Sequence, residues 1–251
     1  MKRDELESYL NKLLNVAKFR DYGPNGLQVE GRAEVRRIVT GVTASQALLD
    51  AAVELDADAV LVHHGYFWKN ESPVIRGMKK QRLAALLKHD INLFGYHLPL
   101  DAHPELGNNA QLGKLLGILN EGVMDERELQ GVGNIGSLPA PLSLETFGQQ
   151  VEAVLGRKPL LVAGGEHPIR RIAWCTGGAQ SYIQQAFELG ADAYLSGEVS
   201  EHTVHSAREN GIHYISAGHH ATERYGIKAL GEHLAGQFGL DTIFLDLDNP
   251  V

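Results

Sequence analysis

Apolar residues recur at helical spacing in some stretches of this chain and form short runs in others. These two patterns predict helices that alternate with short strands. Helical spacing predicts a helix over residues 4–18, with Leu6, Leu10 and Leu13 on its apolar face. Gly, Pro and Asn residues predict a loop over 21–31. Because helices and strands alternate, the expected fold class is α/β. Further helices are expected over 45–55, 81–90, 108–116 and 143–155, and strands over 37–42, 59–62, 91–96, 159–162, 172–176 and 213–218.

The chain also repeats itself. Residues 37–64 align without gaps on residues 171–198, and ten of the 28 positions are identical, where unrelated sequences share about two. Each copy reads as a strand, a helix and a second strand, and a strand ending in histidine follows each copy, at 91–98 and at 212–220. Convergence of unrelated βαβ units is the alternative, but ungapped identity over this length favours internal duplication.

The duplication predicts two related α/β lobes. We expect these lobes at 1–125 and 165–251. The segment 126–164 is expected to be a short connection, because 120–141 is rich in Gly, Pro and charge. It is too short to hold a large inserted domain.

Composition excludes several classes of protein. The net charge is −8 and there is no Lys/Arg run, which argues against extended nucleic acid as a partner. The single cysteine, Cys175, excludes an internal disulfide and a cysteine-based zinc site. No apolar run reaches the length of about 18 residues that suggests a membrane span, and the first residues do not form a signal peptide. We therefore expect a cytoplasmic protein with no membrane partner.

Candidate metal ligands follow three of the predicted strands. His63 and His64 come directly after the strand at 59–62, Asp101 comes shortly after the strand at 91–96, and His219 and Glu223 come after the strand at 213–218. The carboxyl ends of parallel strands meet at one edge of a sheet, so side chains that are distant in sequence can converge there. The sequence therefore predicts a shared metal site.

The spacing favours two metal ions. Adjacent residues of a regular strand point to opposite faces, so His63 and His64 are expected to bind different ions at a frayed strand end. His219 and Glu223 are four residues apart and can lie on one face of a helix. Imidazole and carboxylate ligands favour zinc, iron or manganese. His202 and His205 are candidates either for hydrogen bonds to the ligands or for a solvated helix face.

These residues also carry a family resemblance that covers nearly the whole chain. The sequence resembles the NIF-three-like dimetal family, whose members are called type 2 GTP cyclohydrolase I, and among them the bacterial YbgI proteins. The matching stretches are Asn25-Gly26-Leu27-Gln28-Val29, Val62-His63-His64-Gly65, His97-x-x-x-Asp101, Gly107-Asn108-Asn109, Ser196-Gly197-Glu198 and Gly218-His219-x-x-Thr222-Glu223.

The resemblance implies that the two lobes bind metal and face each other across a dinuclear metal cleft. It also implies a ligand set, an assembly and a reaction. The metal ligands of the family fall on His63, His64, Asp101, His219 and Glu223, and the family forms toroidal homohexamers built as trimers of dimers. The implied reaction is ring-opening hydrolysis of a purine nucleotide by a metal-bound hydroxide, with His97 as a candidate proton shuttle. Two alternatives stay open, a non-catalytic metal-binding or regulatory protein and a dimetal phosphoesterase.

Overall fold

Two units make up the chain in the computed structural model, which describes residues 1–125 and 130–251. The first unit consists of 1–100 and 227–248, and the second of 101–226 and 249–251. Each unit has its own β-sheet, so the protein is an α/β protein with two sheets.

The first unit is built on a five-stranded sheet in the order β1-β4-β3-β2-β11. Strand β1 pairs antiparallel with β4, and the other neighbours pair in parallel. The strands are β1 (Gly26–Val29), β2 (Arg37–Thr43), β3 (Ala59–His64), β4 (Asn92–Gly95) and β11 (Asp241–Phe244), and the helices are α1 (Arg3–Leu13), η1 (Val16–Lys18), α2 (Gln46–Glu54), α3 (Gly77–His89), α4 (Leu98–Asp101) and α10 (Arg224–Phe238), the last two also reaching into the second unit.

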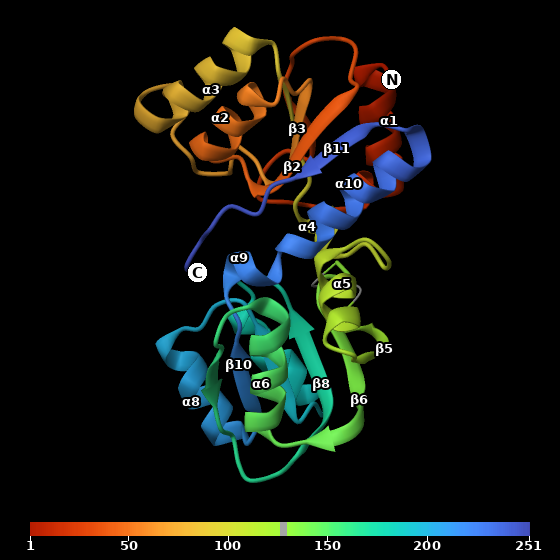
Figure 1. The fold of residues 1–251 in the computed structure, drawn as a ribbon. Coiled ribbons are helices and arrows are strands. Elements are labelled where there is room, and N and C mark those ends of the chain that lie inside the picture. Colours follow the sequence, from red (N-terminus) through yellow and green to blue (C-terminus); the bar gives the residue numbers. More distant parts are fainter. Residues whose placement is uncertain (126–129) are drawn as a thin grey trace. The chain divides into compact units, whose positions relative to one another are not determined.

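Helices cover both faces of this sheet. On one face, α2 and α3 pack on an apolar core that includes Leu48 and Val60 (Figure 1). On the other face α1 and α10 are joined by a 2.6 Å hydrogen bond between the Tyr9 hydroxyl and His233. Coverage on both sides explains why the central strands are continuous apolar runs.

The second unit is built on a six-stranded sheet in the order β5-β6-β8-β9-β10-β7. Strands β8, β9 and β10 pair in parallel, and the other neighbouring strands pair antiparallel. The strands are β5 (Leu119–Val123), β6 (Asn134–Leu142), β7 (Leu160–Val162), β8 (Ile169–Cys175), β9 (Ala193–Ser196) and β10 (His213–Ser216), and the helices are α5 (Asn108–Leu115), α6 (Leu144–Leu155), η2 (Gln180–Tyr182), α7 (Ile183–Glu188), α8 (Glu201–Asn210) and α9 (His219–Thr222).

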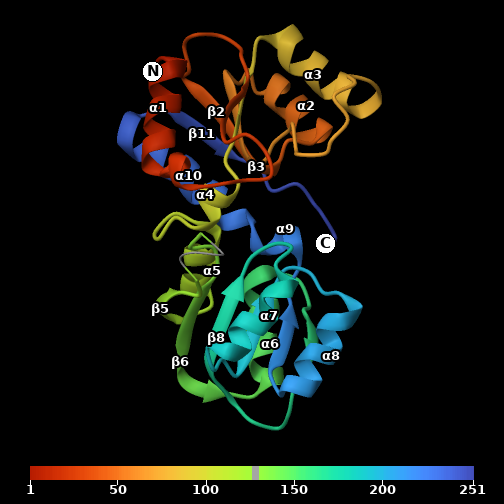
Figure 2. The ribbon, with the colours of Figure 1, turned by 180° about the vertical axis from the view of Figure 1, so that it is seen from behind.

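The core of this second unit lies between the sheet and helices α5 and α6. Phe147 and Val151 of α6 pack with Trp174 and Leu195 of the central strands. Helix α6 covers the face seen in Figure 1, and α7 covers the opposite face, which Figure 2 shows from behind.

Most of the predicted elements are present, although several of their bounds differ from those expected. The helix expected over 4–18 ends at Leu13, because Asn15 adopts a left-handed backbone with φ of 50° and a separate turn follows it. The loop expected over 21–31 contains the edge strand β1, whose pairing with β4 is a tertiary contact that no local pattern shows. The strand expected over 59–62 extends through His64.

The segment expected to connect the lobes is part of the second unit. Residues 130–164 contribute β6, α6 and β7, and β6 is paired on both sides within the sheet. Its Gly and Pro residues suggested a linker, whereas long-range strand pairing places it in a folded layer. Residues 126–129 of the expected connection lie outside the described residues.

The two sheets share a detailed pattern of contacts. Ile38 pairs with Ala59 in the first sheet as Ile172 pairs with Ala193 in the second. The Oδ2 atom of Asp58 accepts hydrogen bonds from the backbone N–H groups of Arg36 and Arg37, at 2.7 and 2.9 Å.

The second sheet has the same carboxylate contacts. The Oδ2 atom of Asp192 accepts from the N–H groups of Arg170 and Arg171, at 2.8 and 2.9 Å. Each sheet also has an antiparallel edge strand, β1 beside β4 and β7 beside β10. The common framework places β3 and β9, and the residues that follow them, at corresponding positions.

Candidate functional site

Three histidines of the first unit lie together at the ends of neighbouring strands. His63 and His64 are the last two residues of β3, and His97 follows β4. One ring nitrogen from each lies within 4.8 Å of the others. His63 is buried, and its ring centroid is 4.5 Å from that of His64 and 5.1 Å from that of His97. Nitrogen atoms at these distances form a donor set suited to a transition-metal ion.

Hydrogen bonds orient each of these rings through Nδ1. The Nδ1 atom of His63 lies 3.0 Å from the carbonyl oxygen of Tyr96. A carbonyl oxygen only accepts hydrogen bonds, so Nδ1 carries the proton and Nε2 carries the lone pair. The Nδ1 atom of His64 lies 3.1 Å from the hydroxyl of Thr43. Rings held in this way are prepared for metal coordination through Nε2.

The third ring, that of His97, is held by a buried carboxylate that no sequence pattern marks as a candidate. The Oδ1 atom of Asp21 is 2.7 Å from Nδ1 of His97, and Oδ2 accepts from Asn25 Nδ2 and from the N–H of Leu98. Burial raises the pKa of Asp21, but its hydrogen bond and charge contact with His97 outweigh burial and lower the pKa overall. The loop at 21–31 was predicted only as a loop, yet its Asp and Asn anchor the histidine.

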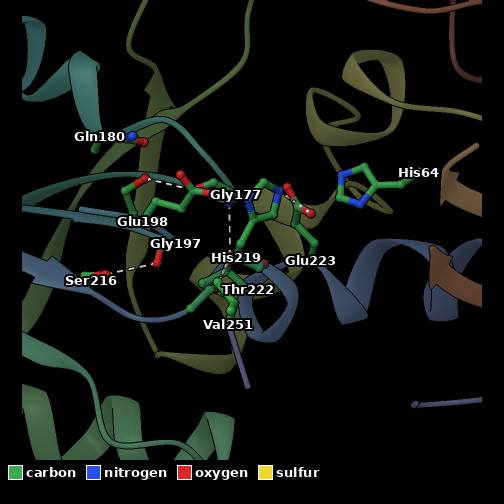
Figure 3. A network of polar contacts seen from close by, with 12 residues as sticks. His64, Gly177, Gln180, Gly197, Glu198, Ser216, His219, Thr222, Glu223 and Val251 are labelled. Atoms are coloured by element: carbon green, nitrogen blue, oxygen red, sulfur yellow. Dashed lines mark hydrogen bonds and ion pairs between the residues drawn. The ribbon is translucent and has the colours of Figure 1, made fainter. Parts of the chain in front are cut away.

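In the second unit, His219 and Glu223 form a close pair. His219 begins the short helix α9, and its Nε2 lies 3.2 Å from Oε2 of the buried Glu223. On the opposite side of the ring, Nδ1 lies 2.7 Å from Oε1 of Glu198 (Figure 3). Burial lowers the pKa of His219, but the two carboxylates outweigh it and raise the pKa to about 9. An imidazole nitrogen beside a carboxylate oxygen is a donor pair that zinc, iron and manganese accept.

Gly177 makes room for this pair. A Cβ atom at residue 177 would lie 2.0 Å from Oε1 of Glu223 and 3.1 Å from Nε2 of His219. Its φ of +69° also favours glycine, and its N–H donates to the Thr222 hydroxyl at 3.0 Å. Glycine at this position therefore lets the backbone approach two candidate ligands closely.

Asp101 is, like Glu223, a buried acid of the second unit. Its Oδ1 accepts a 2.9 Å hydrogen bond from Asn108 Nδ2 and a 3.4 Å one from the Thr176 hydroxyl. Its backbone oxygen accepts from Asn109 Nδ2 at 3.2 Å. Buried carboxylates are rare unless hydrogen-bonded in this way, and the network holds the Asp101 carboxyl group in a fixed orientation as a candidate oxygen ligand.

The other candidates lie elsewhere. His202 and His205 are on the exposed face of α8, and His205 pairs with Glu201 on the same helix. Of the two alternatives for these histidines, the solvated helix face fits this exposure. Cys175 is buried in β8, and burial raises the pKa of its thiol well above the usual value, as expected of a core residue and not of a nucleophile.

Residues 1–250 match the family model of Duf34/NIF3 (NGG1p interacting factor 3). The chain belongs to this family. The resemblance seen in the sequence is thereby confirmed. A Pseudomonas aeruginosa protein called "GTP cyclohydrolase 1 type 2 homolog" is 61% identical over 240 residues, which cover 96% of this chain and 95% of that protein. A Yersinia pestis protein of the same name is 60% identical, with full coverage of both chains.

Solved structures of Duf34/NIF3 relatives share the fold. A protein described as ybgI, of unknown function, is 58% identical and has a TM-score of 0.97, with all of both chains covered. Reduced HcgD from Methanocaldococcus jannaschii is 25% identical with a TM-score of 0.85 over 98% of each chain. The α/β class predicted from the sequence is therefore correct. Among the described residues, no helix has the length and apolar character needed to cross a membrane.

Proposed function

We propose that this protein is a dinuclear-metal-dependent hydrolase that opens the imidazole ring of a purine nucleotide. The observation that supports it is the presence of oriented imidazole donors in the first unit and of oriented imidazole and carboxylate donors in the second. The names of the relatives point to the guanine nucleotide GTP as the substrate to test first.

In this proposal five side chains bind two divalent ions. The ligands are His63, His64, Asp101, His219 and Glu223. Three imidazoles and two carboxylates suit zinc, iron or manganese better than calcium or magnesium. Such ions supply Lewis acidity, which makes water a nucleophile near neutral pH. The donor set contains no cysteine, so no thiolate would bind the ions, as is common in hydrolytic metal centres.

His97 supplies the proton transfers that the reaction needs. Its Nδ1 donates to Asp21, so Nε2 carries the lone pair that accepts a proton. Addition of one water to C8 of guanine and cleavage of a ring C–N bond leaves a formamide, and the departing nitrogen takes a proton. A second water then cleaves the formamide and releases formate. His97 accepts the proton from water and returns it to the nitrogen.

Incubation of zinc-, iron- and manganese-loaded protein with GTP tests this function. We expect formate and a ring-opened product, and loss of at least 100-fold of the rate in His63→Ala and Glu223→Ala. His202→Ala is the control, because this exposed histidine should leave the rate unchanged. A parallel incubation with bis(p-nitrophenyl) phosphate tests phosphoester hydrolysis. Diester cleavage without formate would replace the proposed reaction, and binding of metal without any turnover would support a non-catalytic protein.

A further inference from the structure

We propose that Glu198 is a positioning residue, which holds His219 so that its Nε2 atom, together with Glu223, faces a metal ion. This inference rests on the metal site of the proposed function and is independent of the proposed reaction. It goes beyond the five proposed ligands, because Glu198 is not one of them. The sequence showed Glu198 only as part of a shared motif without a role.

The two ring nitrogens of His219 contact different carboxylates. Glu198 lies at Nδ1, at 2.7 Å, and Glu223 lies at Nε2, at 3.2 Å. An imidazole that donates Nδ1–H to a carboxylate presents the Nε2 lone pair to a metal. A carboxylate on the second nitrogen also fixes the ring plane and raises the basicity of the coordinating nitrogen.

Glu198 is itself held by the backbone around it. Its N–H donates to the carbonyl oxygen of Gly177 at 3.2 Å, and its own carbonyl oxygen accepts from the Tyr214 hydroxyl. At Gly197, a Cβ atom would lie 2.7 Å from Cα of His219, so the end of β9 passes directly against the start of α9. Glu198, which follows Gly197, is therefore placed beside the imidazole ring of His219 (Figure 3).

The repeat strengthens the inference. In the ungapped alignment Glu198 corresponds to His64 and Gly197 to His63. The position that carries a proposed ligand in the first copy therefore carries, in the second, an acid directed at the ring of a different proposed ligand. Glu198 is partly exposed, with a side-chain exposure of 40%, so its effect is expected to be moderate in size.

The chain contains a matched pair for comparison. Glu201 and His205 on α8 are also a carboxylate and an imidazole, 2.9 Å apart. Their side chains are 84% and 61% exposed, and neither is a proposed ligand. Glu201→Gln removes the same charge from the same kind of pair, away from the proposed metal ligands.

The experiment measures zinc affinity and the state of the His219 ring in the full-length protein. Competition with a chromophoric chelator gives the dissociation constants of zinc for wild type, Glu198→Ala, Glu198→Gln and Glu201→Gln. We expect one of the two zinc ions to bind about 10- to 100-fold more weakly in Glu198→Ala. Glu198→Gln should lose less zinc affinity than Glu198→Ala, because its amide oxygen still accepts a hydrogen bond. Glu201→Gln should bind zinc as tightly as wild type does.

A spectroscopic readout separates positioning from a general loss of structure. In zinc-loaded protein with 15N-labelled histidine, long-range NMR correlations report which nitrogen of His219 is protonated, with His219→Gln used for assignment. We expect protonated Nδ1 and coordinated Nε2 in wild type and in Glu198→Gln, and loss of the protected Nδ1 proton in Glu198→Ala. Wild-type zinc affinity and an unchanged Nδ1 proton in Glu198→Ala would overturn the inference.

The possible failures are distinguishable. Two tightly bound zinc ions in wild type without formate release would overturn the proposed reaction and leave the affinity test of Glu198 intact. Failure of wild type to bind zinc would overturn the metal site and this inference together.

Discussion

At the scale of single residues, His219 is the group whose surroundings change its chemistry most clearly. Two carboxylates flank its ring, and together they outweigh burial and raise its pKa from 6.5 to about 9. In the absence of metal, the ring therefore carries a proton near neutral pH and bridges Glu198 and Glu223. A metal ion at Nε2 must displace that proton, which couples metal binding to pH.

The raised pKa predicts how the stability of the metal-free protein depends on pH. A group whose pKa is higher in the folded state stabilises the fold fully below its unfolded pKa of 6.5, and that contribution is lost as pH rises through about 9. After treatment with chelator, wild type should therefore exceed His219→Gln in Tm at pH 6, and the difference should shrink by pH 9.5. Thermal unfolding at both pH values measures it, and a difference that widens with pH would contradict the assignment.

Gly177 is the second residue whose role follows from its contacts. Gly177→Ala should lower the Tm and weaken zinc binding, because the added methyl would lie 2.0 Å from Oε1 of Glu223. Gly190→Ala is the matched control. Gly190 has a similar φ of +72° but nothing within 4 Å of the added methyl, so only the backbone strain of about 1–2 kcal/mol applies. Equal zinc affinities in the two variants would show that Gly177 has no steric role at the ligands.

At the scale of elements, corresponding turns in the two sheets use the same interactions. Arg37 Nη1 donates to the carbonyl oxygen of Leu55, and Arg171 Nη1 donates to that of Leu189, both at 2.8 Å. With the carboxylate contacts of Asp58 and Asp192, these bonds recur at the same positions of the aligned copies. We propose that an internal duplication produced them, because independent βαβ units do not require the same side chains at these turns.

These carboxylates are expected to contribute to stability in both copies. Asp192→Ala removes the acceptor of two backbone N–H groups and should lower the free energy of unfolding by about 1–3 kcal/mol. Asp58→Ala should cost at least as much, because Asp58 also pairs with Arg32 at 2.9 Å. Urea denaturation measures both, with the exposed Asp50→Ala as the control, expected within about 0.5 kcal/mol of wild type. A wild-type midpoint in either variant would contradict this role.

At the scale of the whole molecule, the family resemblance implies an assembly. We propose a homohexamer, a toroid made as a trimer of dimers. Several large apolar side chains of the first unit are exposed in the single chain, among them Val74, Ile75, Met78 and Leu87. Isolated exposed apolar residues are ordinary, but several within one short stretch of chain are typical of surfaces that a partner covers.

The assembly is measurable as a mass. Light scattering coupled to size-exclusion chromatography should give six times the chain mass of 27.4 kDa, about 164 kDa. The measurement is made with and without chelator, at protein concentrations that differ by about 100-fold. A mass of one or two chains at every concentration would refute the hexamer.

The sequence by itself determined the α/β class, the repeat and the residue types of the proposed ligands. These follow from local periodicity and from the comparison of one stretch of the sequence with another, and neither requires knowledge of contacts in the folded chain. The sequence placed His63 and His64 at the end of one predicted strand, and the structure brings their rings together with that of His97.

Only the tertiary structure decided which groups hold those side chains. Asp21 acts on His97 across 76 positions, and Glu198 acts on His219 across 21. Strand β1 and the layer formed by 130–164 also arise from long-range pairing. Such contacts form because distant segments bury their apolar faces on one sheet, and the energy of that burial does not show as a pattern in any single stretch of sequence.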